Sequence, residues 1–251
     1  MSAPSPLPPR EAARVARRAL PLLDLTDLGE SATEAGALAL CETARGSGVA
    51  AVCVWPRFVP VSVSALEGSG VRVATVVNFA SGEEDAAQVI RETRETLRAG
   101  ADEIDLVLPY RALMRGDSDG ARAMVSAIRE ACGDRLLKVI LETGMLGDAD
   151  LIARASRLAL EAGADFLKTS TGKTPVSATL PAAEIMLDAI RAGGRPAGLK
   201  VSGGLRRVED AAAYLALADR IMGPDWAGPT TFRIGASALH AELVRALGAE
   251  A

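Results

Sequence analysis

Lysine is scarce in this 251-residue chain. Only four of its 28 lysine and arginine residues are lysine, namely Lys138, Lys168, Lys173 and Lys200. Because arginine supplies positive charge everywhere else, the retained lysines are candidates for chemistry that a guanidinium cannot perform. An amine whose pKa is lowered attacks a carbonyl group and forms a Schiff base, whereas arginine stays protonated. The alternative is that compositional bias placed the few lysines there, or that they serve buried ion pairs.

Histidine and cysteine are also sparse, which excludes several kinds of site. The lone histidine, His240, cannot build a histidine-rich metal site, and its helical context indicates a surface or packing role rather than catalysis. Three cysteines at unrelated spacings argue against a disulfide framework and against a zinc site. We therefore expect a reducing, cytoplasmic environment and no metal.

Aromatic residues make up only 3% of the chain and the net charge is −4, so the stacking platforms and basic surface of nucleic-acid-binding proteins are missing. Hydrophobic runs fall short of the roughly 18 to 20 residues that a membrane helix needs. The first 20 residues show no secretory signal pattern. These absences predict a globular protein that binds neither nucleic acid nor membrane.

Short apolar runs alternate with helix-period segments along the chain. The expected strands are residues 22–26, 49–55, 71–79, 102–108, 136–142, 165–170, 197–202 and 231–237. Eight strands that alternate with helices predict parallel strands joined by right-handed crossovers. Their number predicts an α/β fold of the closed TIM (β/α)8 barrel type. An open doubly wound sheet is the competitor, but it normally has a glycine-rich turn after the first strand, and LLDLTDLGE offers none.

The sequence also indicates where several elements begin and end. Residues 1–9 contain four prolines and are expected to form a flexible tail, followed by a short helix from Arg10 to about Leu20 and a single barrel domain over residues 10–251. Ser81 and Glu84 resemble a capping box before a helix that ends at Gly100.

An internal repeat relates two strands. The phrase AGADEID at residues 99–105 returns as AGADFLK at residues 162–168, two strand-and-helix units later. Asp105 and Lys168 should therefore stand at equivalent heights and face the barrel interior, because alternate strands contribute to one interior layer. Lys138 then lies on the strand between them and Lys200 on the strand beyond.

These positions suggest amine chemistry. A free lysine, with a pKa of about 10.4, is a poor nucleophile at neutral pH, but a second ammonium in a partly desolvated site can lower that pKa towards about 7. Lys200 is the natural neighbour to do this for Lys168. The alternative is a structural ion pair between Lys168 and Asp105. Asp24 is another inward acid, expected to balance Lys138 in a supporting role.

Glycines and hydroxyls follow the later strands, where barrels usually bind phosphate through backbone N–H groups. The candidate substrate- and phosphate-binding residues are Thr171, Gly172, Lys173, Ser202, Gly203, Gly204, Gly235 and Ser237. Glycine pairs alone often serve only as turns. Together with the lysines they predict a phosphorylated carbonyl substrate and a covalent step at strand six.

These motifs resemble the deoxyribose-phosphate aldolase family over about nine tenths of the chain. FLKTSTGK together with GADEID is the most specific part of the resemblance, and VCVWPRFVP, LKVILETG, VSGGLRRVEDA and FRIGASAL extend it. The resemblance implies a TIM-barrel class I aldolase that needs no metal or other cofactor. The implied reaction is reversible cleavage of 2-deoxy-D-ribose 5-phosphate into D-glyceraldehyde 3-phosphate and acetaldehyde, and we expect a homodimer.

Positions carried over from the resemblance assign roles. Lys168 matches the Schiff-base lysine, Lys200 the second lysine that depresses its pKa, and Asp105 the acid that moves a proton through an ordered water. Cys53 matches a pocket cysteine near the aldehyde and is expected to be a bystander. The phosphate site falls on Gly172, Gly203, Gly204, Gly235 and Ser237, with help from Lys173.

Some positions depart from the family pattern. Trp55 is bulkier than expected, Ser202 replaces a common alanine, and Ala238 replaces a serine, so we expect one phosphate hydrogen bond fewer. The chain ends in LGAEA rather than in a tail with tyrosine, which predicts slower turnover. Two other functions stay open: a class I aldolase or transaldolase acting on a longer sugar phosphate, and a barrel that binds a sugar phosphate without chemistry.

Overall fold

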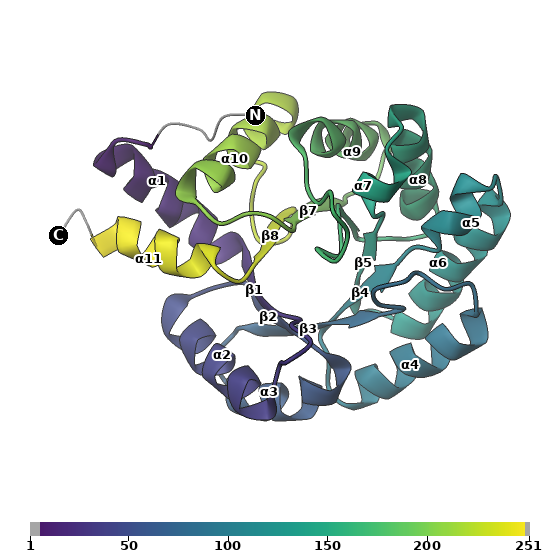
Figure 1. Cartoon of the computed structure of the whole chain (residues 1–251), viewed down its shortest axis with the longest axis horizontal. Helices are drawn as coiled ribbons and strands as arrows, with labels where there is room; N and C mark the ends of the chain where they lie inside the picture. The colour runs from purple at the N-terminus through teal and green to yellow at the C-terminus, as the bar shows by residue number, and fades with distance from the viewer. Residues whose placement is uncertain (1–5, 249–251) are drawn as a thin grey trace.

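Eight parallel strands close into a barrel at the centre of the computed structural model, which describes residues 6–248 (Figure 1). Closure is complete because β1 pairs with β8, with Leu23 opposite Ile234. Each strand overlaps one of the predicted runs, so the TIM barrel is confirmed over the open sheet. The strands are β1 Leu23–Asp27, β2 Ala51–Val54, β3 Arg72–Val77, β4 Glu103–Val107, β5 Leu136–Ile140, β6 Phe166–Lys168, β7 Gly198–Ser202 and β8 Phe232–Ala236.

Helices surround the barrel and connect successive strands (Figure 1). The crossover helices are α2 Glu34–Ser47, α3 Val59–Leu66, α4 Ala86–Arg98, α6 Ser118–Cys132, α8 Ala149–Glu161, α9 Leu180–Ala192 and α10 Val208–Met222, and α11 Leu239–Gly248 follows β8. Shorter segments add α5 Tyr110–Met114, α7 Thr143–Leu146 and the 3₁₀ turns η1 Leu20–Leu22 and η2 Pro56–Phe58. Among the described residues, none of these helices is long and apolar enough to cross a membrane.

The expected N-terminal helix is present as α1 Pro9–Ala19, which lies beside α11 at one edge of the barrel (Figure 1). The helix begins one residue earlier than predicted. Proline suits the first helical position, because the missing N–H would have no partner there. Of the expected tail, residues 1–5 lie outside the described part of the chain, as do residues 249–251 of the expected barrel domain and LGAEA ending.

The predicted capping box at Ser81 and Glu84 is wrong. The helix α4 begins at Ala86, and the side chain of Asp85 accepts a hydrogen bond from the backbone N–H of Gln88. The reason lies in the preceding turn, where the Asn78 side chain donates to the Glu83 carbonyl and accepts from the Glu83 N–H, at 2.9 Å each. Those two bonds hold the chain in a turn and delay the helix.

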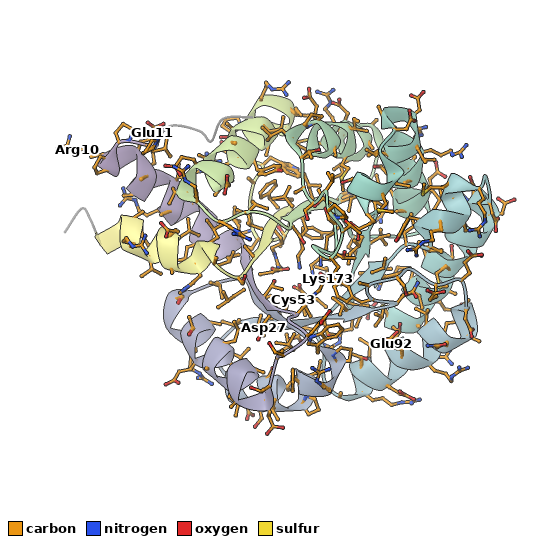
Figure 2. All side chains as sticks on the ribbon, in the orientation of Figure 1. Arg10, Glu11, Asp27, Cys53, Glu92 and Lys173 are labelled. Carbon is orange, nitrogen blue, oxygen red and sulfur yellow. The ribbon has the colours of Figure 1, made fainter. Side chains whose placement is uncertain are left out.

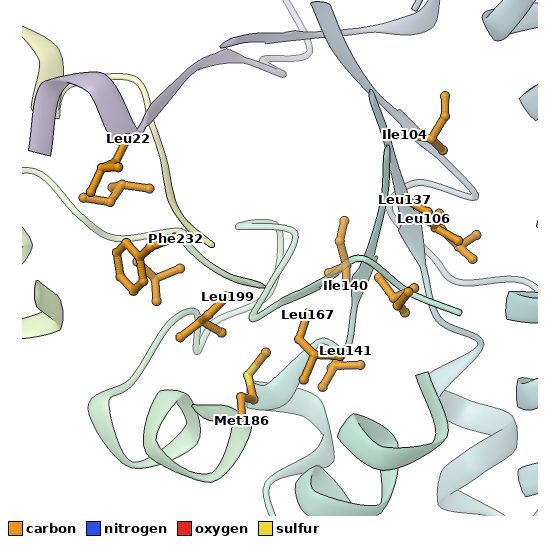
Figure 3. Close-up of a cluster of buried hydrophobic side chains, with 14 of the residues drawn as sticks. Leu22, Ile104, Leu106, Leu137, Ile140, Leu141, Leu167, Met186, Leu199 and Phe232 are labelled. Carbon is orange, nitrogen blue, oxygen red and sulfur yellow. The ribbon is translucent and has the colours of Figure 1, made fainter. Parts of the chain in front are cut away.

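The apolar core lies between the strands and the surrounding helices (Figure 3). Leu137, Leu167 and Leu199 on adjacent strands are fully buried, as is Met186 of α9. Burial of each such side chain contributes about 1.5–3 kcal/mol. Because this outer layer supplies the hydrophobic stabilisation, the barrel interior is left free to hold polar groups.

Candidate active site

Charged side chains from six strands gather inside the barrel. Successive residues of a strand point to opposite faces, so residues two apart, such as Glu103 and Asp105, share the interior. All of these charged residues are at most 5% exposed: Asp24, Glu103, Asp105, Lys138, Lys168, Lys200 and Arg233. The sequence predicted five of them as inward-facing, and it did not single out Glu103 and Arg233.

Lys168 and Asp105 meet as the internal repeat predicted. Lys168 Nζ lies 2.7 Å from Asp105 Oδ2. In the hydrogen-bond ladder, however, Asp105 is opposite Lys138, and Lys138 is opposite Phe166. Lys168 is therefore two residues further along than the ladder row of Asp105. Strand tilt and stagger in a barrel bring residues of different ladder rows to one height, which explains the contact.

Asp105 is shared by three lysines. Besides Lys168, its carboxylate contacts Lys138 Nζ through Oδ1 at 2.8 Å and Lys200 Nζ through Oδ2 at 2.8 Å. In a simple ion pair, the Asp105 carboxylate would neutralise the Lys168 ammonium alone. Here a single carboxylate serves three ammonium groups, so it does not neutralise Lys168.

The expected pairing of Asp24 with Lys138 is present, but it is the longest of the ion pairs that Asp24 forms. Asp24 Oδ2 lies 3.8 Å from Lys138 Nζ but only 2.6 Å from Lys200 Nζ, and its Oδ1 accepts from Arg233 at 2.6 Å. The closest carboxylate to Lys138 is Glu103, at 2.6 Å. The two-residue alternation offered a signal for both missed residues, because Glu103 precedes Asp105 by two and Arg233 precedes Gly235 by two.

Burial and neighbouring charges move the proton affinities of these lysines in different directions. Burial and, next, the nearby Lys200 ammonium lower the pKa of Lys168, against the opposing pull of Asp105. For Lys200, burial acts in the same sense, but Asp105 and Asp24 outweigh it and hold its pKa well above the usual value. Of this pair, Lys168 is thus the lysine that loses its proton more readily.

Cys53 on β2 lies near the centre of the ring of strands, where Figure 2 labels it. The residue is fully buried, and burial raises the pKa of its thiol. A protonated thiol is a weak nucleophile. The environment therefore agrees with the expected bystander role.

A cavity of about 330 Å³ opens at the carboxyl ends of β1, β6, β7 and β8. All eight predicted substrate- and phosphate-binding residues line it, from Thr171 to Ser237. Gly172, Gly203 and Gly204 have φ angles of 77°, 89° and 87°, which favour glycine. A larger cavity of about 800 Å³ lies between α8 and α9 on the outer surface, and its lining contains no lysine.

Not every side chain around this cavity is available to a ligand. Ser202 Oγ donates to the Ser170 carbonyl at 2.9 Å. Lys173, which Figure 2 labels, donates from Nζ to the Leu28 carbonyl at 2.7 Å across the mouth. Gly235 is closely packed, since a Cβ there would lie 2.9 Å from Lys200 Cε. The cavity therefore offers backbone groups of its glycines and the hydroxyl of Ser237, which is what an anion site needs.

Glu142 supports this cavity and was not anticipated from the sequence. It is fully buried, with a φ of 53° in the left-handed region, which is rare outside glycine. Its carboxylate accepts from Thr171 Oγ1 at 2.5 Å, from the Thr171 N–H at 3.3 Å and from Thr174 Oγ1 at 3.2 Å. The turn after β5 therefore holds the loop that follows β6.

Trp55 and His240 form hydrogen bonds outside the set of interior charged side chains. Trp55 Nε1 donates to the Gly29 carbonyl at 2.9 Å, and the Trp55 ring packs edge-on against Phe79, so its bulk fixes the loop after β1. His240 Nε2 lies 2.7 Å from Ser47 Oγ, joining α11 to α2 as the predicted packing residue. Within residues 6–248, no group of three or more His, Cys, Asp or Glu side chains is arranged to hold a metal ion.

Comparison with known proteins places this chain in a family. Residues 22–242 match the DeoC/LacD family of aldolases. The chain belongs to that family. A curated deoxyribose-phosphate aldolase from Agrobacterium fabrum strain C58 is 51% identical over 243 residues, covering 95% of this aldolase and 93% of the relative.

Solved structures agree with this family. A candidate deoxyribose-phosphate aldolase from Toxoplasma gondii ME49 superposes with a TM-score of 0.88 at 29% identity, covering 96% of both chains. A second, from Coccidioides immitis, gives 0.83 at 32% identity, covering 92% of this aldolase and 85% of that chain. The chain is accordingly an aldolase, a carbon–carbon lyase whose substrates are small sugar phosphates.

Proposed function

We propose that this aldolase cleaves 2-deoxy-D-ribose 5-phosphate into D-glyceraldehyde 3-phosphate and acetaldehyde, reversibly, through a Schiff base on Lys168. One observation supports this most directly. Lys168 is a buried amine with a lowered pKa that contacts a single carboxylate oxygen, and Lys200 contacts that same oxygen. A lowered pKa increases the share of uncharged amine, and the uncharged amine attacks an aldehyde.

In the cleavage direction, Lys168 Nζ adds to C1 of the open-chain sugar, and loss of water leaves an iminium ion. The iminium accepts the electron pair of the C2–C3 bond as that bond breaks. The C3 hydroxyl loses its proton, so that C3 becomes the aldehyde carbon of glyceraldehyde 3-phosphate. The remaining enamine is protonated at C2, and water hydrolyses the resulting iminium to acetaldehyde and free Lys168.

Asp105 and Lys200 provide the charges and proton positions around this step. The three lysines together hold the pKa of Asp105 well below its usual range, against the effect of burial, so Asp105 stays ionised. A carboxylate 2.7 Å from Lys168 Nζ stabilises the cationic iminium as it forms. We assign to Asp105, with Lys200 beside it, transfer of the C3 hydroxyl proton.

The phosphate group belongs in the cavity at the mouth. Gly172, Gly203, Gly204 and Gly235 supply backbone N–H groups there and Ser237 a hydroxyl, while Lys138 and Asp24 support the interior charges. Binding energy from the phosphate then orients C1 over Lys168. Homodimeric assembly and a cytoplasmic location stay predictions, and a deoxyribose phosphate aldolase from Aeropyrum pernix is described as tetrameric.

Trapping with borohydride tests the covalent step. Incubation with acetaldehyde and borohydride should add one ethyl group to the protein, and peptide mass spectrometry should locate it on Lys168. A reduced adduct on Lys138 or Lys200 instead would contradict the assignment. The Lys168→Arg variant should lose the adduct and more than 1,000-fold of kcat, because a guanidinium cannot act as the nucleophile.

A coupled assay for glyceraldehyde 3-phosphate release identifies the reaction. With deoxyribose 5-phosphate as substrate, acetaldehyde should form in equal amount. Preference for a longer sugar phosphate in the same assay would indicate another class I aldolase or a transaldolase. Binding of deoxyribose 5-phosphate without any borohydride adduct would indicate a barrel that binds sugar phosphates without chemistry.

A further inference from the structure

The interior charges form a closed ring of contacts around the barrel. The contacts run from Asp105 to Lys138, Glu103, Arg233, Asp24 and Lys200 and back to Asp105, and Lys168 joins the ring through Asp105. Each of these contacts is between 2.6 and 2.9 Å. Two of these seven residues, Arg233 and Glu103, have no part in the proposed chemistry.

The ring contains one more cation than it has carboxylates. Its cations are three lysines and Arg233, and its acids are Asp24, Glu103 and Asp105. The two remaining strands add no charge that would balance this surplus. β2 contributes the Cys53 thiol, whose raised pKa keeps it neutral, and β3 contributes the apolar side chains of Ala74 and Val76. A surplus charge is costly in a buried interior, so the ring is most stable after losing one proton.

Geometry decides which cation loses that proton. Arg233 cannot, because a guanidinium stays protonated in proteins. Lys138 contacts Glu103 and Asp105, and Lys200 contacts Asp24 and Asp105, so each is held by two carboxylates at 2.8 Å or less. Lys168 has one contacting oxygen, Asp105 Oδ2, which Lys200 also uses.

We propose that Arg233 and Glu103 are positioning residues that set the charge balance of the ring, and thereby make Lys168 the ammonium that gives up its proton. Arg233 supplies the fixed positive charge that creates the surplus. Glu103 limits that surplus to one and retains the proton on Lys138. The inference rests on the proposed function, since it concerns the amine that forms the Schiff base.

Removing the charge of Arg233 and removing that of Glu103 should have opposite effects on Lys168, which tests the charge-balance role. The rate of iminium formation at Lys168 is measured with acetaldehyde, which has no ionisable group, between pH 5 and 10 and trapped with borohydride. Arg233→Met removes the surplus charge and should move the midpoint of the pH profile up by about one unit. Glu103→Gln enlarges the surplus and should move it down by about one unit. One unit is the effect of a unit charge across roughly 10 Å at an effective dielectric constant of about 20.

Matched variants separate charge from packing. Arg233→Lys keeps the positive charge and should restore the midpoint of the unmodified protein. The double variant Arg233→Met with Glu103→Gln again has a surplus of one and should also restore it. Thermal denaturation of every variant checks folding, and because Glu103→Gln moves the midpoint in the opposite direction, it tests the idea even if Arg233→Met does not fold.

The outcomes distinguish this inference from the proposed function. If the single variants form the adduct on Lys168 but their midpoints stay in place or move in the same direction, the charge-balance role is wrong while the Schiff-base mechanism stands. If the unmodified protein forms no adduct on Lys168, the proposed function itself is wrong. Opposite midpoint shifts with restoration in the double variant would establish the role.

Discussion

Lys168 and Lys200 are chemically identical side chains on adjacent strands, opposite one another in the ladder, yet the structure shifts their pKa values in opposite directions. The difference comes from the number of carboxylates that each contacts. Lys200 lies between Asp24 and Asp105, whereas Lys168 reaches only Asp105. At the scale of single residues, reactivity here is a matter of which lysine has fewer partners.

Asp105 is the residue whose loss should cost most. The change Asp105→Asn leaves three buried ammonium groups without their shared carboxylate. We expect a loss of about 3–5 kcal/mol in the free energy of unfolding and of about 100-fold or more in kcat. Urea unfolding and the coupled assay measure the two effects.

The matched control for Asp105→Asn is Asp188→Asn on α9. The Asp188 side chain is 51% exposed and pairs with Arg191 within its own helix. Because exposed ion pairs contribute little, this variant should stay within about 0.5 kcal/mol of the unmodified protein and keep its activity. Equal stability of the two variants would contradict the shared role of Asp105.

At the scale of elements, the loop between β6 and α9 depends on the turn after β5. Besides the Glu142 hydrogen bonds, Gly144 of α7 packs so closely that a Cβ there would lie 2.0 Å from the Val176 carbonyl oxygen. Gly203 likewise has room for no side chain, since a Cβ would meet Ser177 at 2.6 Å. Three loops from different strands therefore fit together around the cavity, and each limits the conformations of the others.

The variant Glu142→Gln should weaken substrate binding through the phosphate. Its carboxamide has one acceptor oxygen where the carboxylate has two, so it cannot accept the Thr171 and Thr174 hydrogen bonds at two separate oxygens, and it carries no charge to strengthen them. Loss of a charge-assisted hydrogen bond corresponds to an increase of about 10-fold or more in KM for deoxyribose 5-phosphate. We expect kcat to change little.

Unphosphorylated 2-deoxyribose provides the control substrate for Glu142→Gln. Its kcat/KM should be the same in the variant and the unmodified protein, because it has no phosphate for the loop to bind. The exposed Glu161→Gln, on α8, is the control variant and should alter neither substrate's kinetics. Equal losses for both substrates would indicate that Glu142 affects the lysine chemistry or the general fold.

At the scale of the whole molecule, barrel closure concentrates ionised groups where water is excluded, so stability should depend on pH. Neighbouring cations lower the folded-state pKa values of Asp24 and Asp105, although burial opposes this. Carboxyls with lowered pKa values stabilise the fold above their unfolded pKa of about 3.9, and this stability is lost as the pH falls below it.

Urea unfolding at a series of pH values checks this expectation. Between pH 7 and 5 these two carboxyls should contribute no slope. Below about pH 4 the free energy of unfolding should fall by up to about 2.7 kcal/mol per pH unit, because the unfolded chain binds two protons that the folded barrel does not. Asp24→Asn should reduce that slope by about half. An unchanged slope in this variant would contradict the contribution of Asp24.

The sequence by itself determined the alternation of strands and helices, and hence the barrel, because two-residue and helical periods are local properties of the chain. It also pointed to Lys168, Asp105 and Lys200 through lysine scarcity and the repeated AGAD phrase. Only the tertiary structure decided the partners of each charge, such as Glu103 with Lys138 and Arg233 with Asp24. The AGAD repeat relates the heights of Asp105 and Lys168 alone. Strand stagger sets the distances between the other charges, and no local pattern encodes that stagger.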